Sequence, residues 1–198
     1  MKKYFMNYIK NTVYLIVLLG YSSAFSGSYE DFFAAIKQDN AAVVRQLLAR
    51  GFDPNTIDPK GQNGLYLALQ EPSPKVAQVL AEWPKTNVNM LNAQGESVLM
   101  IAALKDNIDA ANSLVKRDAD VNKTGWAPLH YAATSGSLAI LSLLLDKHAY
   151  IDAESPNGST PLMMAAMYGT PQAVKLLIDA GADPLLKNQQ GLTAIDFA

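Results

Sequence analysis

Two histidines and two pairs of acidic residues are the side chains of this chain that could do chemistry. They are His130, His148, the pair Asp118 and Asp120, and the pair Asp152 and Glu154. Imidazole and carboxylate groups bind divalent cations and transfer protons, so a cluster of them would predict a metal site or an acid–base centre. Whether they act together depends on the elements that hold them.

These groups follow no catalytic or zinc-binding pattern. The chain has no cysteine, and its two histidines fall on different predicted elements, which makes a poor set of zinc ligands. No serine stands in a context that pairs it with a histidine and an acid, and no glycine-rich loop resembles a phosphate cradle. We therefore expect no enzyme, no metal site and no cofactor. The alternative is a ligand- or metal-binding protein that uses the acidic pairs and His148.

A glycine that returns at a near-constant interval organises the chain. Gly61, Gly95, Gly125, Gly158 and Gly191 are 34, 30, 33 and 33 residues apart. A period in this range is typical of a stacked helical solenoid. The same frame extends backwards to a first repeat without its leading hairpin. The predicted repeats are 29–60, 61–94, 95–124, 125–157 and 158–190, with a partial sixth at 191–198.

Each repeat predicts two short helices. Seven positions after the glycine stands an alanine that lets neighbouring helices approach closely: Ala68, Ala102, Ala132, Ala165 and Ala198. Five positions later comes a residue able to cap the second helix: Ser73, Asn107, Ser137 or Thr170. The second helices carry apolar residues at i, i+3 and i+4, which indicates one buried face. We expect these helices to end near Asp118, His148 and Gly181.

The motifs in this frame resemble the ankyrin-repeat signature. The resemblance rests on Gly125–Ala133, Gly158–Ala166, Leu177–Asp183 and Asp120–Asn122, and it extends over about residues 29–198. It implies an all-α ankyrin-repeat solenoid of stacked helix–turn–helix units with projecting β-hairpin fingers. In that family, partners usually bind on the fingers and on the concave face made by the first helices. The resemblance also implies that His130 is structural and ties adjacent loops together.

Three departures from the family pattern predict local irregularities. The second repeat has Gly64–Leu69 where the family prefers Thr-Pro-Leu-His-x-Ala, and it ends in Trp83–Pro84 with one extra residue. The third repeat is three residues short between Asn122 and Gly125, which predicts a short finger and a notch beside it. The chain stops midway through a first helix, so we expect the natural protein to continue with one capping helix.

The N-terminal segment is typical of an export signal. Lys2, Lys3 and Lys10 precede the apolar run Val13–Leu19, and small residues follow. We expect a cleavable signal peptide over 1–26, a domain over 27–198 and a periplasmic location, as in the small exported ankyrin-repeat proteins of Gram-negative bacteria that this chain resembles. The alternative is an uncleaved signal that anchors a scaffold to the membrane.

The predicted function is non-enzymatic protein binding. Cleavage would leave 13 basic and 18 acidic residues, which argues against nucleic acid. We expect a monomer without stable membrane insertion, acting as an inhibitor or immunity protein or as a helper of a stress enzyme. The candidate partner-binding residues are Lys123, Trp126, Tyr131, Met167 and Tyr168. The alternatives are that Trp126 only covers the short finger and that Met167 and Tyr168 pack in the core, where we expect Met163 and Met164.

Overall fold

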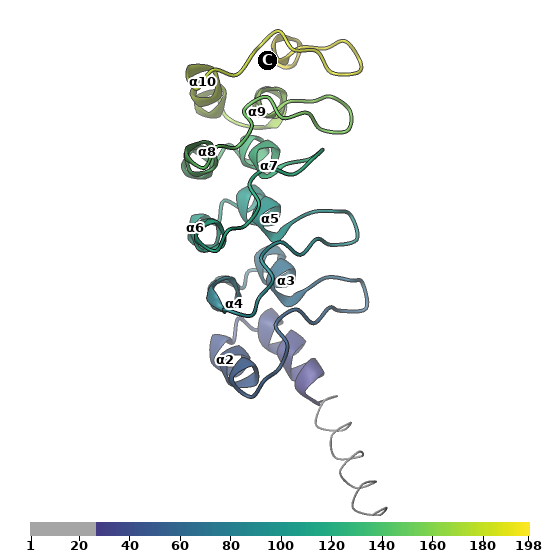
Figure 1. Ribbon diagram of the computed structural model, residues 1–198, viewed down its shortest axis with the longest axis vertical. Helices are drawn as coiled ribbons and strands as arrows, with labels where there is room; N and C mark the ends of the chain where they lie inside the picture. The colour runs from purple at the N-terminus through teal and green to yellow at the C-terminus, as the bar shows by residue number, and fades with distance from the viewer. Residues whose placement is uncertain (1–26) are drawn as a thin grey trace, which may run out of the picture.

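The computed structural model describes residues 27–198, which form a stack of helix pairs in two rows (Figure 1). The inner row begins with the helical residues 27–37 and continues through α3 (Gly64–Gln70), α5 (Val98–Leu104), α7 (Pro128–Ser135), α9 (Pro161–Tyr168) and the 3-10 helix η1 (Ala194–Phe197). The outer row contains α2 (Ala41–Ala49), α4 (Pro74–Glu82), α6 (Ile108–Lys116), α8 (Leu138–Asp146) and α10 (Pro171–Asp179). The predicted all-α solenoid is confirmed.

The core lies between the two rows and is continuous along the stack. The repeat alanines Ala68, Ala102, Ala132 and Ala165 are at most 2% exposed, so the inner helices approach each other closely there. Ala198, the fifth alanine of this set, is exposed. The departure at Gly64 also has a packing reason: a Cβ atom at this position would lie 2.6 Å from the ring of Phe32. Glycine is therefore what allows the first two repeats to pack.

Short polar side chains begin most of the outer helices. Asn107, Ser137 and Thr170 each accept a hydrogen bond from the backbone N–H three residues later, as predicted. Ser73 does not. Its hydroxyl donates to the carbonyl of Ile36 at 2.6 Å, and Asp39 of the preceding repeat accepts from the Val76 N–H at 2.9 Å. The predicted cap at Ser73 is wrong, because the N-terminus of α4 is capped by the neighbouring repeat.

The outer helices end where the sequence pattern predicts. Asp118, His148 and Gly181 follow α6, α8 and α10 with φ values of 60°, 62° and 100°. All three are therefore in the left-handed region that terminates a helix. His148 is exposed and serves as a helix stop.

The fingers are hairpin-shaped loops that project from the inner row (Figure 1). Single antiparallel bridges close two of them, at Ile57 with Asn63 and at Leu91 with Ser97. Within residues 27–198 no longer strand forms, so the predicted β-hairpins are present only as these isolated pairs. The finger that precedes α7 is visibly shorter than its neighbours, as the shortened third repeat predicts.

A ladder of asparagines joins the loops of successive repeats. Asn122 donates to the carbonyl of His148 and accepts from the N–H of Tyr150, both at 2.8 Å. Asn89 and Asn55 make the same pair of bonds one and two repeats earlier, respectively. Asp152 holds the next position, where its carboxylate accepts from the Asp183 N–H at 3.1 Å. A carboxylate cannot donate a hydrogen bond, so Asp152 makes only one of the two bonds that Asn122 makes.

The irregular loop after α4 is held by the following repeat. Arg117 donates to the carbonyls of Ala81 at 2.8 Å, Pro84 at 3.1 Å and Thr86 at 2.8 Å. One guanidinium thus satisfies three backbone acceptors in the segment that carries the extra residue.

The predicted signal peptide, residues 1–26, lies outside the described part of the chain. Among residues 27–198 there is no helix with the length and apolar character needed to cross a bilayer.

Candidate functional site: an apolar hollow on the concave face

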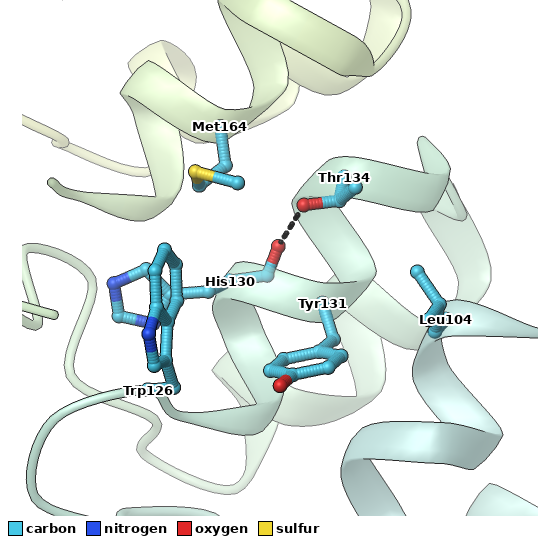
Figure 2. A pocket seen from close by; sticks show the side chains of 6 residues that line it. All are labelled: Leu104, Trp126, His130, Tyr131, Thr134 and Met164. Carbon is cyan, nitrogen blue, oxygen red and sulfur yellow. Dashed lines mark hydrogen bonds between the residues drawn. The ribbon is translucent and has the colours of Figure 1, made fainter.

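A hollow of about 200 Å³ opens on the inner row beside the short finger (Figure 2). Helix α5 contributes Leu104, α7 contributes His130, Tyr131 and Thr134, and α9 contributes Met164. Trp126, from the short finger, completes the lining. The hollow therefore spans three repeats.

Trp126 and His130 form one side of the hollow. The two rings meet edge to face, with centroids 5.3 Å apart and planes at 76°. His130 is fully buried. Its Nδ1 accepts from the Ala127 N–H at 3.1 Å, so Nε2 carries the proton and donates to the Ser159 carbonyl at 3.0 Å. Burial lowers the pKa of His130, although its backbone hydrogen bonds partly oppose that effect. The prediction that His130 ties adjacent loops is confirmed.

Tyr131 forms another wall and is anchored by the preceding repeat. Its hydroxyl donates to Glu96 Oε1 at 2.9 Å, while Tyr66 donates to Glu96 Oε2 at 3.1 Å. Asn92 also donates to Glu96 Oε2, at 2.8 Å. Burial, followed by the hydrogen bond and charge of Glu96, raises the pKa of Tyr131. Both tyrosines therefore stay protonated and donate to one carboxylate.

The predicted partner-binding residues fall into two groups in the structure. Trp126 and Tyr131 line the hollow, and Lys123 is half-buried in the short finger, where its ammonium donates to the Thr124 carbonyl at 3.2 Å. Met167 and Tyr168 lie at the C-terminal end of α9, 43% and 62% exposed, and do not line the hollow. The alternative that these two residues belong to the core is wrong.

Trp126 is neither fully exposed nor fully buried. It is half-buried against His130, and it also lines an open hollow. The two methionines predicted as core differ from each other. Met163 is 2% exposed, whereas Met164 is half-buried and turns towards the hollow (Figure 2).

Sequence reasoning did not predict Leu104, Met164 or Glu96 as residues of the site. Leu104 is 38% exposed at the end of α5, and an apolar residue at that concave-face position was a usable signal. Glu96 carried no such signal, because its role depends on two tyrosines from other repeats.

One carboxylate of each acidic pair accepts a hydrogen bond from the backbone. Asp120 accepts from the Asn122 N–H at 2.9 Å, and Asp152 accepts from the Asp183 N–H. Asp118 is a left-handed helix stop, as is His148. No group of three or more potential metal-ligating side chains occurs in the part of the chain that the structure describes.

Comparison with known proteins identifies the family. The family of ankyrin repeats matches three overlapping stretches, residues 32–124, 84–155 and 129–198. The chain belongs to the ankyrin-repeat family. Its predicted membership is confirmed, and ankyrin repeats typically serve as protein-interaction modules.

Relatives and solved structures of this family have varied roles. The human transient receptor potential cation channel subfamily A member 1 is 32% identical over 166 residues, which is 77% of this chain and 15% of the channel subunit. This ankyrin-repeat protein thus spans only a small part of that relative. The ankyrin-repeat domain of Bcl-3 superposes with a TM-score of 0.71 at 29% identity, covering 84% of this chain and 76% of that one.

A second solved structure pairs a predatory endopeptidase from Bdellovibrio bacteriovorus with an immunity protein. The matching chain has a TM-score of 0.71 and 30% identity, covering 84% of this ankyrin-repeat chain and 89% of that one.

Proposed function

We propose that this ankyrin-repeat protein is a non-enzymatic module that binds a partner protein across its fingers and concave face. The observation that carries the proposal is the apolar hollow on the inner row, with Leu104, Met167 and Tyr168 exposed on the same row. Exposed aromatic and methionine side chains around a concavity are typical of interface anchors. A rigid stack presents them at a small cost in conformational entropy.

Within this class, we favour an inhibitor or immunity role in the periplasm. Two observations support it: the N-terminal pattern of an export signal, and the similarity to a chain from a complex that contains an immunity protein. A helper of a stress enzyme is the other role within the class. A tight one-to-one complex favours the inhibitor, and weak binding of several partners favours the helper.

The location is tested on the full chain, carrying a C-terminal affinity tag and expressed in a Gram-negative host. N-terminal sequencing of the protein from the periplasmic fraction should give a start at Gly27 or Phe25. Retention of Met1 in a membrane fraction would contradict export by cleavage and favour the anchored scaffold.

The binding role is tested by capture of partners from a periplasmic extract with the same tagged chain. The test variant is Trp126→Ala/Tyr168→Ala, which removes two side chains from the concave side. The matched control is Leu138→Ala/Ile178→Ala, because Leu138 and Ile178 are exposed on the outer helices α8 and α10.

A protein retained by the wild type and the control, but lost by the test variant, supports the proposal. Equal retention by all three proteins moves the interface to the outer helices or the termini. If none of the three proteins retains a partner, the result contradicts a protein-binding role.

A further inference from the structure

The hollow has the size of one planar side-chain group. Its volume is about 200 Å³, and a dry protein cavity of about 150 Å³ is enough to bind benzene. A planar group with a short apolar stem therefore fits. Figure 2 shows the rings of Trp126 and Tyr131 on two sides of the space, while Leu104 and Met164 border it from other helices.

The polar side-chain atoms of the lining have more acceptor than donor capacity left. Both ring nitrogens of His130 have backbone partners. The hydroxyl of Tyr131 donates its proton to Glu96. The hydroxyl of Thr134 donates to the His130 carbonyl, and both hydroxyl oxygens still have lone pairs that can accept. The indole N–H of Trp126 is the exception, because it can only donate. A group rich in donors therefore finds more partners in the hollow than a carboxylate does.

A negative charge lies just behind one wall of the hollow. The Tyr131 hydroxyl lies 2.9 Å from Glu96 Oε1. The donors to Glu96 are the neutral groups of Tyr131, Tyr66 and Asn92, so these hydrogen bonds leave the charge of the carboxylate in place. Within residues 27–198 no cation forms an ion pair with Glu96. Because screening at physiological ionic strength takes effect over about 8 Å, this carboxylate acts across the single ring of Tyr131.

The lysines that neighbour the lining residues in sequence have other contacts. Neither Lys105 nor Lys123 lines the hollow. Lys105 lines a separate groove together with Glu71, and the Lys123 ammonium donates to the Thr124 carbonyl. The hollow is therefore an apolar, aromatic space beside a carboxylate that has no cationic partner.

We propose that the hollow binds an arginine side chain of the partner protein. The guanidinium would lie against the rings of Trp126 and Tyr131, where a cation–π contact is favourable, with its charge complementary to that of Glu96. Its methylene stem would contact Leu104 and Met164. Arginine fits better than lysine, because a guanidinium is planar, is less strongly hydrated and stacks on aromatic rings. This inference rests on the proposed protein-binding function and specifies the side chain of the partner that is recognised.

Two small probes that differ in charge and hardly in shape test the inference. They are N-acetyl-arginine amide and N-acetyl-citrulline amide, in which a neutral urea group replaces the guanidinium. Each probe is titrated into the ¹⁵N-labelled full chain and followed by NMR. The arginine probe should shift the indole N–H signal of Trp126 in a saturable way, while that of Trp83 stays in place. The variant Trp83→Phe assigns the two signals.

The preference for a cation sets the expected order of affinities. The citrulline probe should bind about two- to fivefold more weakly than the arginine probe, which is the effect of one exposed cation–π contact. The difference should shrink in high salt, where the charge of Glu96 is screened. N-acetyl-phenylalanine amide should also bind more weakly, since it uses the apolar lining alone. Equal or tighter binding of citrulline or phenylalanine, or no shift with arginine, would overturn the inference.

Three variants test whether the charge of Glu96 sets this preference. Glu96→Gln should weaken binding of the arginine probe and bring its affinity closer to that of citrulline. Tyr131→Phe breaks the same hydrogen bond but keeps the ring and the charge, so it should still prefer arginine. Glu71→Gln is the matched control for net charge, because Glu71 is exposed on the inner row and lines the separate groove. It should bind both probes as the wild type does, and an unchanged preference in Glu96→Gln would overturn the inference.

The outcome is separable from that of the capture experiment. A captured partner that binds Glu96→Gln as tightly as the wild type overturns this inference and leaves the protein-binding function intact. Binding of the arginine probe without any captured partner supports the chemistry of the hollow and contradicts the proposed function.

Discussion

The Tyr131 hydroxyl donates a 2.9 Å hydrogen bond to the Glu96 carboxylate across 35 positions of the chain. The other oxygen of Glu96 accepts from Tyr66, at 3.1 Å. One carboxylate thus joins the inner helices α3 and α7, which lie on either side of α5. This bond fixes the ring that forms one wall of the hollow.

Glu96→Gln should lower the free energy of unfolding by about 1–2 kcal/mol, because an amide has one acceptor oxygen for two tyrosine donors. The measurement is urea denaturation of Glu96→Gln, Tyr131→Phe and the double variant. A coupling of about 1 kcal/mol between the two sites is expected. If the two single changes in the free energy of unfolding add up to that of the double variant, the bond between Glu96 and Tyr131 contributes nothing in solution.

His130 should make the protein sensitive to mild acid. Burial lowers its pKa in the fold, whereas the histidine of an unfolded chain has a pKa of about 6.5. The stabilisation that the neutral His130 provides is therefore complete above about pH 6.5. It is lost as the pH falls towards the pKa of His130 in the fold, because in that range only the unfolded chain binds the proton. The free energy of unfolding should fall by up to about 1.4 kcal/mol per pH unit.

Urea denaturation between about pH 7.5 and pH 5 measures this slope. His130→Asn removes the titrating group and should flatten the curve, although the variant is less stable throughout. The same slope in the variant and the wild type would assign the acid sensitivity to other groups.

Asp152→Asn should stabilise the protein by about 1 kcal/mol, because an amide at this position can donate to the following loop as Asn122 does. The reverse change, Asn122→Asp, is the matched control. It should destabilise the protein by a similar amount, since the His148 carbonyl loses its donor. Thermal denaturation of both variants gives their melting temperatures. If both temperatures shift in the same direction, the asparagine ladder does not stabilise the protein as described.

Arg117→Ala should destabilise the protein by about 2–3 kcal/mol, because three carbonyls between Ala81 and Thr86 lose a charged donor. Hydrogen exchange should show faster exchange confined to residues 81–89. Arg45→Ala is the control, since Arg45 is exposed on the outer helix α2. If amide exchange became faster uniformly over the whole stack, Arg117 would stabilise the entire fold and not the loop after α4 alone.

Ala132→Leu should destabilise the fold by about 1–3 kcal/mol through overpacking, because Ala132 is completely buried where inner helices meet. Ala139→Leu is the control at an exposed position of α8. Chemical denaturation provides the midpoints. An unchanged midpoint for Ala132→Leu would contradict the close approach of the inner helices.

The sequence by itself determined the family, the helix pairs, most caps and the helix ends. These features depend on local chemistry. A cap such as Thr170 bonds to the N–H three residues away, and Gly181 adopts its left-handed conformation within its own loop. The short finger could also be read directly, because a deletion between two repeat landmarks shortens the segment that joins them.

Only the tertiary structure decided how neighbouring repeats use one another's side chains. Asp39 replaces Ser73 as the cap of α4, and Arg117 binds the loop of the preceding repeat. Glu96 accepts hydrogen bonds from two tyrosines of different repeats. The hollow likewise needs side chains from three helices. Each of these contacts joins residues about one repeat apart or more, and each depends on how the helices stack in space. A local pattern can place a residue on a helix face, but it cannot specify which distant side chain meets it.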